Sequence, residues 1–213
     1  MMTQLIQEFP RFFNYYNLLF LAQAVGTTIA LSAIGCLFGL LFGCLISTVR
    51  LTDKPWLAPL RWIALLFTEF FRRVPFLVTL MLIFFLFQLS GANLPLFVVA
   101  SLSVTLIASA FLAEIIRAGL LSIHRNQWDA ATAMNFGLLQ SIRYVVLPQA
   151  WKIILPPAFG FFVMFIKDTA LASQIGVIEL TFAGKVLNNK GFSAILVFGL
   201  SLIHISEPTR RRG

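Results

Sequence analysis

The chain has 213 residues, of which 59% are hydrophobic and only 11% are charged. Soluble domains carry about 25% charged residues, so too few polar side chains are present to cover a water-soluble globule of this length. The formal net charge of +8 would suggest nucleic-acid binding in a soluble protein, but here the basic residues lie in short segments beside apolar runs, which is typical of membrane-protein loops. We therefore expect one all-α integral membrane domain, embedded in the lipid bilayer, with no nucleic-acid partner.

The first expected span lies within Phe12–Val49, where no charged residue occurs. From Leu18 onward the run is long enough to cross about 30 Å of hydrocarbon at about 1.5 Å per residue. Small residues recur at or near four-residue steps along one face of this helix: Gly26, Gly35, Gly39 and Gly43. We expect another helix to approach this face closely. Cys36 and Cys44 lie in the same run without metal-ligand or disulfide spacing, so we interpret them as small apolar fillers.

The second and third expected spans lie within Val74–Ala113, which is again free of charged residues. The turn-forming segment 90–95 divides this stretch into two runs that must cross the membrane and return. Before them, Arg61 and Glu69 interrupt the apolar pattern of residues 56–71, which favours an interfacial helix or the entrance of a long helix.

The fourth expected span, Ile153–Ile166, is apolar but has only fourteen residues and contains Pro156 and Pro157. It must therefore be short, kinked or extended by its neighbours. A final apolar run begins at Phe192. Together these runs predict about five transmembrane helices.

The interval 114–151 is too hydrophilic to cross the membrane and contains two predicted short helices separated by a sharp bend. Asn126 is the expected cap of the first helix, and Asp129 places a carboxylate in its first turn, where the helix dipole favours negative charge. Asn135 is suited to a left-handed exit from that helix. Leu147–Pro148 is expected to end the second helix.

This interval resembles the cytoplasmic coupling loop in the permease subunits of ABC importers, in particular those of the polar-amino-acid type. The family pattern is Glu-Ala-Ala, three residues and Gly, ending in Leu-Pro. Here Asp129-Ala130-Ala131, Asn135 and Leu147-Pro148 stand at the matching positions. Asp replaces Glu and Asn replaces Gly, and both substitutions are physically mild.

Three further segments resemble the same family in the same order along the chain. Residues 69–77 match its Glu-x-x-Arg-Gly-x-Pro-Leu-Leu pattern, with Arg73 where Gly is usual. Residues 114–119 match its Glu-x-x-Arg-Gly-Gly turn, and residues 167–181 match the stretch before its last helix. Because the four segments agree in order over about residues 20–199, they are far more specific than a single motif.

The resemblance implies a permease domain over residues 1–199, with a coupling loop at about 121–150. In this family a loop helix sits in a cleft of a cytoplasmic ABC ATPase, and Trp128, Met134 and Phe136 are expected apolar anchors for it. The implied partners are an ATPase dimer, a second permease subunit that forms a homodimer or heterodimer, and a soluble amino-acid-binding protein. The residues implied for ATPase coupling are Trp128, Asp129, Ala130, Ala131, Asn135, Gly137, Leu147 and Pro148.

No phosphate-binding Gly-x-x-x-x-Gly-Lys-Ser/Thr loop occurs in the sequence. We therefore expect a transport subunit and not an enzyme, with no cofactor of its own and with ATP and Mg²⁺ bound by the partner ATPase. Three alternatives stay open: the loop helix is an ordinary amphipathic helix at the membrane surface, the chain is a self-contained channel or secondary transporter, or it is a non-transporting scaffold.

Ionisable residues in or beside spans are costly and suggest a pathway for a charged substrate. Glu69, Lys167 and Asp168 are the candidates for this role. The pairs Glu69 with Arg72 and Glu114 with Arg117 are three residues apart on helices, so they also have a simpler interpretation as mutually neutralising pairs.

Lys and Arg counts favour a cytoplasmic coupling loop and an outside N-terminus, because cytoplasmic loops are enriched in these residues. Nine lie on the loop side: Arg50, Lys54, Arg61, Arg72, Arg73, Arg117, Arg125, Arg143 and Lys152. Four lie on the other side: Arg11, Lys167, Lys185 and Lys190. Residues 200–213 are left out because they resemble one reading frame of a sequencing adapter. We expect them to be a non-native tail, with the last helix truncated near Gly199.

Overall fold

The structure is a computed structural model that describes residues 8, 10–52 and 54–199. All regular elements in this part of the chain are helices, which confirms the all-α prediction. Three stretches are long and apolar enough to cross a membrane: Tyr15–Arg50, Leu96–Leu121 and Leu138–Ile175. A bent pair of helices makes a fourth if it is counted as one span.

The predicted fifth span is described only in part. Residues 194–199 are helical, and the rest of that run lies outside the described residues. The tail predicted for residues 200–213 lies outside them as well. The structure therefore tests the first four expected spans in full.

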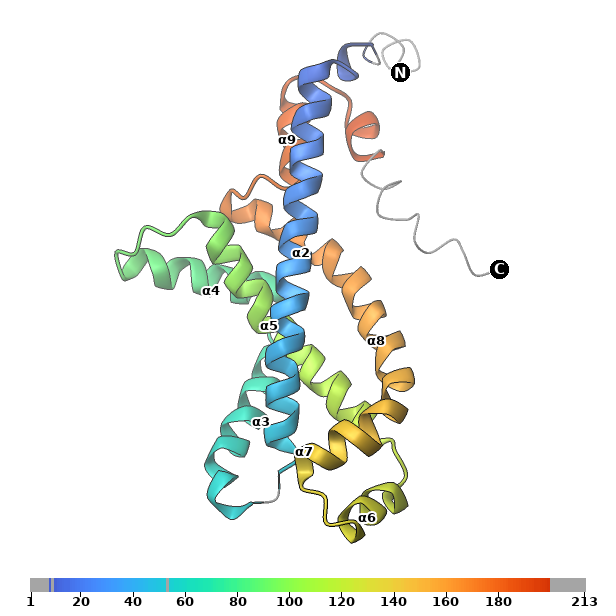
Figure 1. Cartoon of the computed structure of the whole chain (residues 1–213). Coiled ribbons are helices and arrows are strands. Elements are labelled where there is room, and N and C mark those ends of the chain that lie inside the picture. The colour runs from blue at the N-terminus through green and yellow to red at the C-terminus, as the bar shows by residue number, and fades with distance from the viewer. Residues whose placement is uncertain (1–7, 9, 53, 200–213) are drawn as a thin grey trace.

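Helices α2 (Tyr15–Arg50) and α5 (Leu96–Leu121) form the central crossing of the molecule (Figure 1). The glycine face of α2 makes this contact, because a Cβ atom on Gly39 would lie 2.5 Å from the Cβ of Ala108. Gly35 and Gly43 meet α5 in the same way, whereas a Cβ on Gly26 would meet nothing within 4 Å. The predicted close approach is confirmed for these three glycines and wrong for Gly26.

The second expected span, which begins at Val74, corresponds to α4 (Phe76–Leu89) alone. It forms a bent pair with the preceding helix, which follows the single-turn helix η1 (Pro55–Leu57). Helices α3 (Ala58–Arg73) and α4 (Phe76–Leu89) meet at an angle of 112°. Val74 is extended because it precedes Pro75, and a residue before proline avoids the helical conformation. With 14 residues, α4 is about 21 Å long, too short to cross about 30 Å of hydrocarbon alone. Residues 56–71 are therefore not the beginning of one long straight helix.

The polar interval contains α6 (Arg125–Ala133), α7 (Leu138–Gln140) and the π-helix η2 (Ser141–Val146). The chain then continues without a break into α8 (Leu147–Asp168). The prediction that Leu147–Pro148 ends a helix is therefore wrong. Pro148 lies inside this continuous helical stretch, just after the π-helix η2, and local π-type geometry is one way in which a membrane helix accommodates a proline.

Helix α8 also explains how the short fourth span reaches sufficient length. The helical stretch Leu138–Ile175 extends the predicted Ile153–Ile166 at both ends, and Pro156 and Pro157 lie inside it. Its last part is the 3₁₀-helix η3 (Thr169–Ile175). The expected extension by neighbouring residues is confirmed.

Helix α9 (Leu180–Asn189) lies beside the first half of α2, at the end of the molecule opposite α6 (Figure 1). The backbone N–H of Leu180 donates to the Thr28 hydroxyl oxygen over 3.1 Å, which ties the start of α9 to α2. The buried Glu179 carboxylate caps α9 by accepting from the N–H groups of Thr181 and Phe182. Sequence patterns did not indicate this cap.

Candidate functional site

Helix α6 begins two residues earlier than the sequence suggested. His124 is its N-cap, and the His124 Nδ1 accepts from the backbone N–H of Asn126 over 3.3 Å. Asn126 therefore lies within the first turn and is not the cap. Asp129 falls beyond that turn, so its predicted interaction with the helix N-terminus is also wrong. A histidine can fill the N-cap position because its unprotonated ring nitrogen is an acceptor.

The end of α6 follows the sequence prediction. Asn135 has φ of 61°, the left-handed conformation that asparagine tolerates better than most residues. The N–H of Phe136 donates to the carbonyl of Ala131, and the N–H of Asn135 donates to the carbonyl of Thr132. This is the Schellman pattern that reverses the chain after a helix. The predicted sharp bend at Asn135 is confirmed.

The two faces of α6 differ in what they contact. Trp128 is half-buried and packs on a buried cluster that contains Leu120, Val146 and Ala150. Ala131 is only 1% exposed, so its methyl group packs within the chain. Asp129, Ala130 and Met134 are exposed. The expectation that Ala131 presents a surface to a partner is therefore wrong, because the helix register turns it inward.

Polar contacts add to the attachment of α6 and its loop. Gln149 on α8 donates through Nε2 to the side-chain oxygen of Gln127 on α6 over 3.2 Å. Gly137 donates its backbone N–H to the side-chain oxygen of Gln140 over 3.0 Å, which closes the start of α7. The hydrogen bond between Gln127 and Gln149 links α6 directly to α8. Sequence reasoning missed these glutamines, which have no distinctive spacing.

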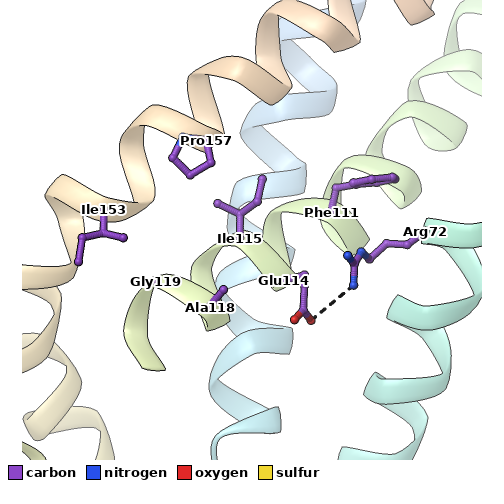
Figure 2. Close-up of a pocket in the computed structure, with 8 residues that line it drawn as sticks. All are labelled: Arg72, Phe111, Glu114, Ile115, Ala118, Gly119, Ile153 and Pro157. Atoms are coloured by element: carbon purple, nitrogen blue, oxygen red, sulfur yellow. Dashed lines mark ion pairs between the residues drawn. The ribbon is translucent and has the colours of Figure 1, made fainter. Parts of the chain in front are cut away.

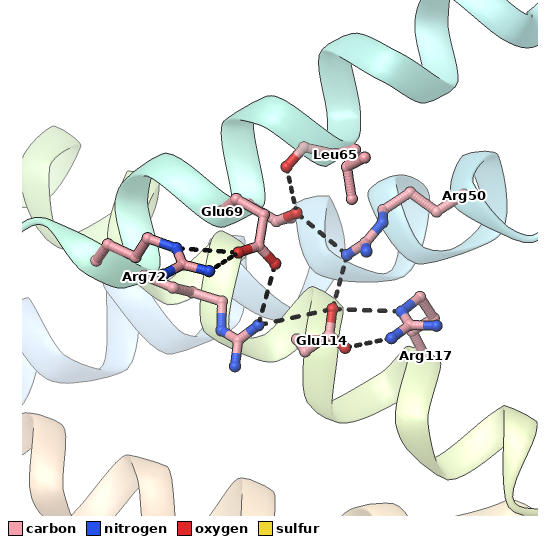
Figure 3. A network of polar contacts seen from close by, with 8 residues as sticks. Arg50, Leu65, Glu69, Arg72, Glu114 and Arg117 are labelled. Carbon is pink, nitrogen blue, oxygen red and sulfur yellow. Dashed lines mark hydrogen bonds and ion pairs between the residues drawn. The ribbon is translucent and has the colours of Figure 1, made fainter.

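A network of charged residues joins α2, α3 and α5 (Figure 3). Arg50, at the end of α2, donates to a Glu114 carboxylate oxygen on α5 over 2.7 Å and to the Thr68 hydroxyl on α3 over 3.1 Å. Arg117 pairs with the same carboxylate from within α5. Arg72 on α3 lies 3.8 Å from it. Glu114 thus faces guanidinium groups from three helices.

The second carboxylate of the network, Glu69, pairs with Arg73 over 2.8 Å and lies 3.8 Å from Arg72. The two intrahelical pairs predicted from spacing, Glu69 with Arg72 and Glu114 with Arg117, both exist. The contacts of Arg50 and Arg72 with Glu114 were missed, because they join residues far apart in the sequence.

Two cavities lie next to this network. One has a volume of about 310 Å³ and is lined by Arg72, Phe111 and Glu114 together with apolar residues of α5 and α8 (Figure 2). The other has a volume of about 220 Å³ and is lined by Arg72, Phe111 and Asp168, among others. Arg72 and Phe111 line both cavities, so the two adjoin.

The three residues predicted for a substrate pathway have different positions. Asp168 lines the smaller cavity. Lys167 is exposed, and neither Lys167 nor Glu69 lines either of the two cavities. In the described part of the chain, no three His, Cys, Asp or Glu residues are grouped so that they could hold a metal ion. Arg72, Glu114 and Asp168 offer charged groups for ion pairing and hydrogen bonding at the cavities.

Comparison with known proteins identifies related sequences. Residues 35–206 match the family model described as binding-protein-dependent transport system inner membrane component. A probable amino-acid ABC transporter permease of Bacillus subtilis is 31% identical over 184 residues, which are 86% of this chain and 80% of that protein. The glutamine transport system permease of Escherichia coli is 33% identical over 180 residues, which are 84% of this chain and 81% of that protein.

Solved structures share the fold. A crystal structure of an amino acid ABC transporter with histidines matches with a TM-score of 0.77 and 27% identity, covering 87% of each chain. An inward-facing methionine ABC transporter matches with a TM-score of 0.73, covering 90% of this chain and 92% of that chain. At 22% identity, the second likeness concerns the fold alone.

Proposed function

The chain belongs to the binding-protein-dependent transport system inner membrane components, and from this premise we propose that it carries polar amino acids across the inner membrane. Members of this family are transport subunits of ABC importers, and ATP hydrolysis takes place on a separate ATPase subunit. The amino-acid substrate is supported by relatives named as permeases for amino acids, glutamine and L-cystine. ATP and Mg²⁺ belong on the ATPase in this proposal.

The observation that carries the proposed mechanism is the attachment of α6. Trp128 and Ala131 pack its inner face against the other helices of the chain. Gln127 is hydrogen-bonded to Gln149 on α8. Its outer face presents Asp129 and the small side chain of Ala130. A compact helix surface suits a groove on a partner, and a rigid attachment passes the partner's movement to α8. We assign to α6 the role of coupling helix for the ATPase dimer.

The remaining partners and the orientation follow from the same proposal. A second permease subunit completes the pathway, and a soluble binding protein delivers the amino acid on the side opposite α6. Arg125 lies in α6 and Arg143 in η2, at the α6 end of the molecule, which supports a cytoplasmic position for that end (Figure 1).

The test is ATP-driven uptake by proteoliposomes that contain the complete transporter with an Ala130→Trp permease. A bulky exposed side chain on α6 blocks the fit to the ATPase, so we expect uptake to fall about tenfold or more while the permease stays folded. The control is Leu45→Trp, which adds the same ring at an exposed apolar position of α2. Ala131 is unsuitable, because enlarging a buried residue disturbs the fold itself.

The result separates the competing functions. Wild-type uptake by the Ala130→Trp transporter would contradict the coupling role of α6. Uptake that needs no ATPase would instead support a self-contained channel or secondary transporter. Association with an ATPase without any uptake would support a scaffold.

A further inference from the structure

An apolar groove of about 410 Å³ lies between α2, α5 and α8. Its wall consists of apolar side chains, among them Leu37 and Leu40 of α2 and Leu155 and Phe159 of α8. Within the described part of the chain it shares no lining residue with the two cavities beside Arg72. Leu37, Leu40 and Phe159 are exposed, so this α2–α8 groove is open to the surroundings of the helices.

The α2–α8 groove lies between two of the candidate membrane spans, Tyr15–Arg50 and Leu138–Ile175. Along α8 its wall runs from Trp151 to Phe162, and the run Ile153–Ile166 carries no charged residue. At about 1.5 Å per residue this wall is about 17 Å long, close to half of the roughly 30 Å thickness of the hydrocarbon core. The groove therefore has the length of one leaflet of the bilayer.

The width of the groove limits what can lie in it. A volume of about 410 Å³ over a length of about 17 Å corresponds to a mean cross-section of about 24 Å². An α-helix with its side chains is about 10–12 Å in diameter, so its cross-section is about 80 Å² or more. A helix therefore cannot lie in the groove, whereas a single hydrocarbon chain of a lipid can.

One end of the groove carries a positive charge. Lys152, Leu155 and Phe159 lie three and four residues apart and so share one face of α8, on which the two apolar residues line the groove. Side chains on a helix point toward its N-terminus, which directs the Lys152 ammonium group away from the apolar run. Lys152 is exposed, and no carboxylate pairs with it among the described residues. Trp151 beside it suits a position at the membrane interface.

The charge around this end of the groove favours an anion. Residues 121–152 contain one acidic side chain and three basic ones, which are Arg125, Arg143 and Lys152. A phospholipid joins an apolar chain to a phosphate at the membrane interface, and basic sites between transmembrane helices bind anionic headgroups. We propose that the α2–α8 groove holds one acyl chain of an anionic phospholipid, with the lipid phosphate on Lys152. Lipid binding there depends only on the membrane-embedded helices and not on the transported substrate or the ATPase.

The experiment is native mass spectrometry of the purified full chain in detergent, titrated with dioleoyl phosphatidylglycerol or dioleoyl phosphatidylcholine. The two lipids have the same acyl chains and differ in headgroup charge. A lysine near the membrane surface contributes about 1 kcal/mol to the binding of an anionic lipid, so the first phosphatidylglycerol should bind about fivefold more tightly than the first phosphatidylcholine. Glycerol 3-phosphate carries the charge without the chain and should not bind.

The charge of the groove is tested at Lys152. Lys152→Gln should weaken the binding of phosphatidylglycerol about fivefold and leave the binding of phosphatidylcholine unchanged, because only the charge is removed. Lys152→Arg should retain the preference. Lys190→Gln is the matched control, since it removes an exposed positive charge just after α9, at the other end of the molecule.

The apolar part of the groove is tested at Ala33, which lines it on α2. Ala33→Phe places a ring in the space for the acyl chain, so the first molecule of either lipid should bind about tenfold more weakly or less tightly still. Ala22→Phe adds the same ring at an exposed position of α2 that does not line the groove, and it should leave binding unchanged.

Three results would overturn the proposal. Equal affinity of the unmodified chain for the two lipids would contradict an anionic occupant. Unchanged lipid binding by the Ala33→Phe chain would place the lipid outside the groove. The spectra also give the number of chains in each particle, and a dimer that is lost in Ala33→Phe but kept in Ala22→Phe would assign the groove to a second copy of the chain.

Discussion

Arg50 and Arg73 show that arginines of the same network differ in their structural role. The Arg50 side chain is 8% exposed and joins α2 to α3 and α5 through Thr68 and Glu114. The Arg73 side chain is 79% exposed, and within the described part of the chain its ion-pair partner is Glu69, on its own helix. Buried charges need their partners, whereas exposed ion pairs contribute little to stability.

Arg50→Met should therefore destabilise the protein, because Thr68 and Glu114 lose a charged partner in a buried place. Hydrogen bonds to charged groups contribute about 1.5–3 kcal/mol each, so the loss of both should lower the midpoint of thermal unfolding in detergent by roughly 6–24 °C. Arg73→Met is the matched control and should shift the midpoint much less. Equal shifts of the unfolding midpoint for the two variants would show that the burial of Arg50 does not determine its contribution to stability.

Close packing of α2 on α5 depends on single glycines. A Cβ on Gly39 would lie 2.5 Å from Ala108 Cβ and 3.1 Å from the backbone nitrogen of Ser109. Backbone atoms cannot move aside as a flexible side chain does, so the two helices would have to separate. Gly26 on the same helix has free space around it.

Gly39→Ala should for this reason lower stability by about 1–3 kcal/mol, while Gly26→Ala should leave it unchanged or raise it slightly. Both variants add one methyl group and improve helix propensity equally, so their difference isolates the contact with α5. Unfolding midpoints of the two purified proteins provide the measurement. A stable Gly39→Ala protein would mean that α2 and α5 lie farther apart than described.

At the scale of the whole molecule, α6 and the end of α9 lie far apart along α2 (Figure 1). If α6 couples to a cytoplasmic ATPase, a cysteine at Ala130 should be labelled by a membrane-impermeant maleimide only in inside-out vesicles. A cysteine at the exposed Asn188 should be labelled only in the opposite orientation. Both tests use the chain with Cys36→Ala and Cys44→Ala. Labelling of the two positions from the same side would contradict the proposed orientation.

Features that depend on neighbouring residues or on overall composition could be predicted from the sequence. The scarcity of charged residues predicted the membrane domain, and the spacing of Gly35, Gly39 and Gly43 predicted a close helix contact. The suitability of Asn135 for a left-handed conformation predicted the end of α6. These features are accessible because local conformation and helix periodicity act over a few residues.

Contacts between residues far apart in the chain became visible only in the folded protein. Local patterns did not reveal that Arg50 reaches Glu114, that Arg72 and Asp168 face one cavity, or that the register of α6 turns Ala131 inward. Even the effect of Pro148 depended on context, because a residue type that commonly ends a helix lies here inside a continuous helical stretch. Contacts between residues far apart in sequence are set by how whole helices pack. That packing depends on all the contacting side chains together and not on any local pattern.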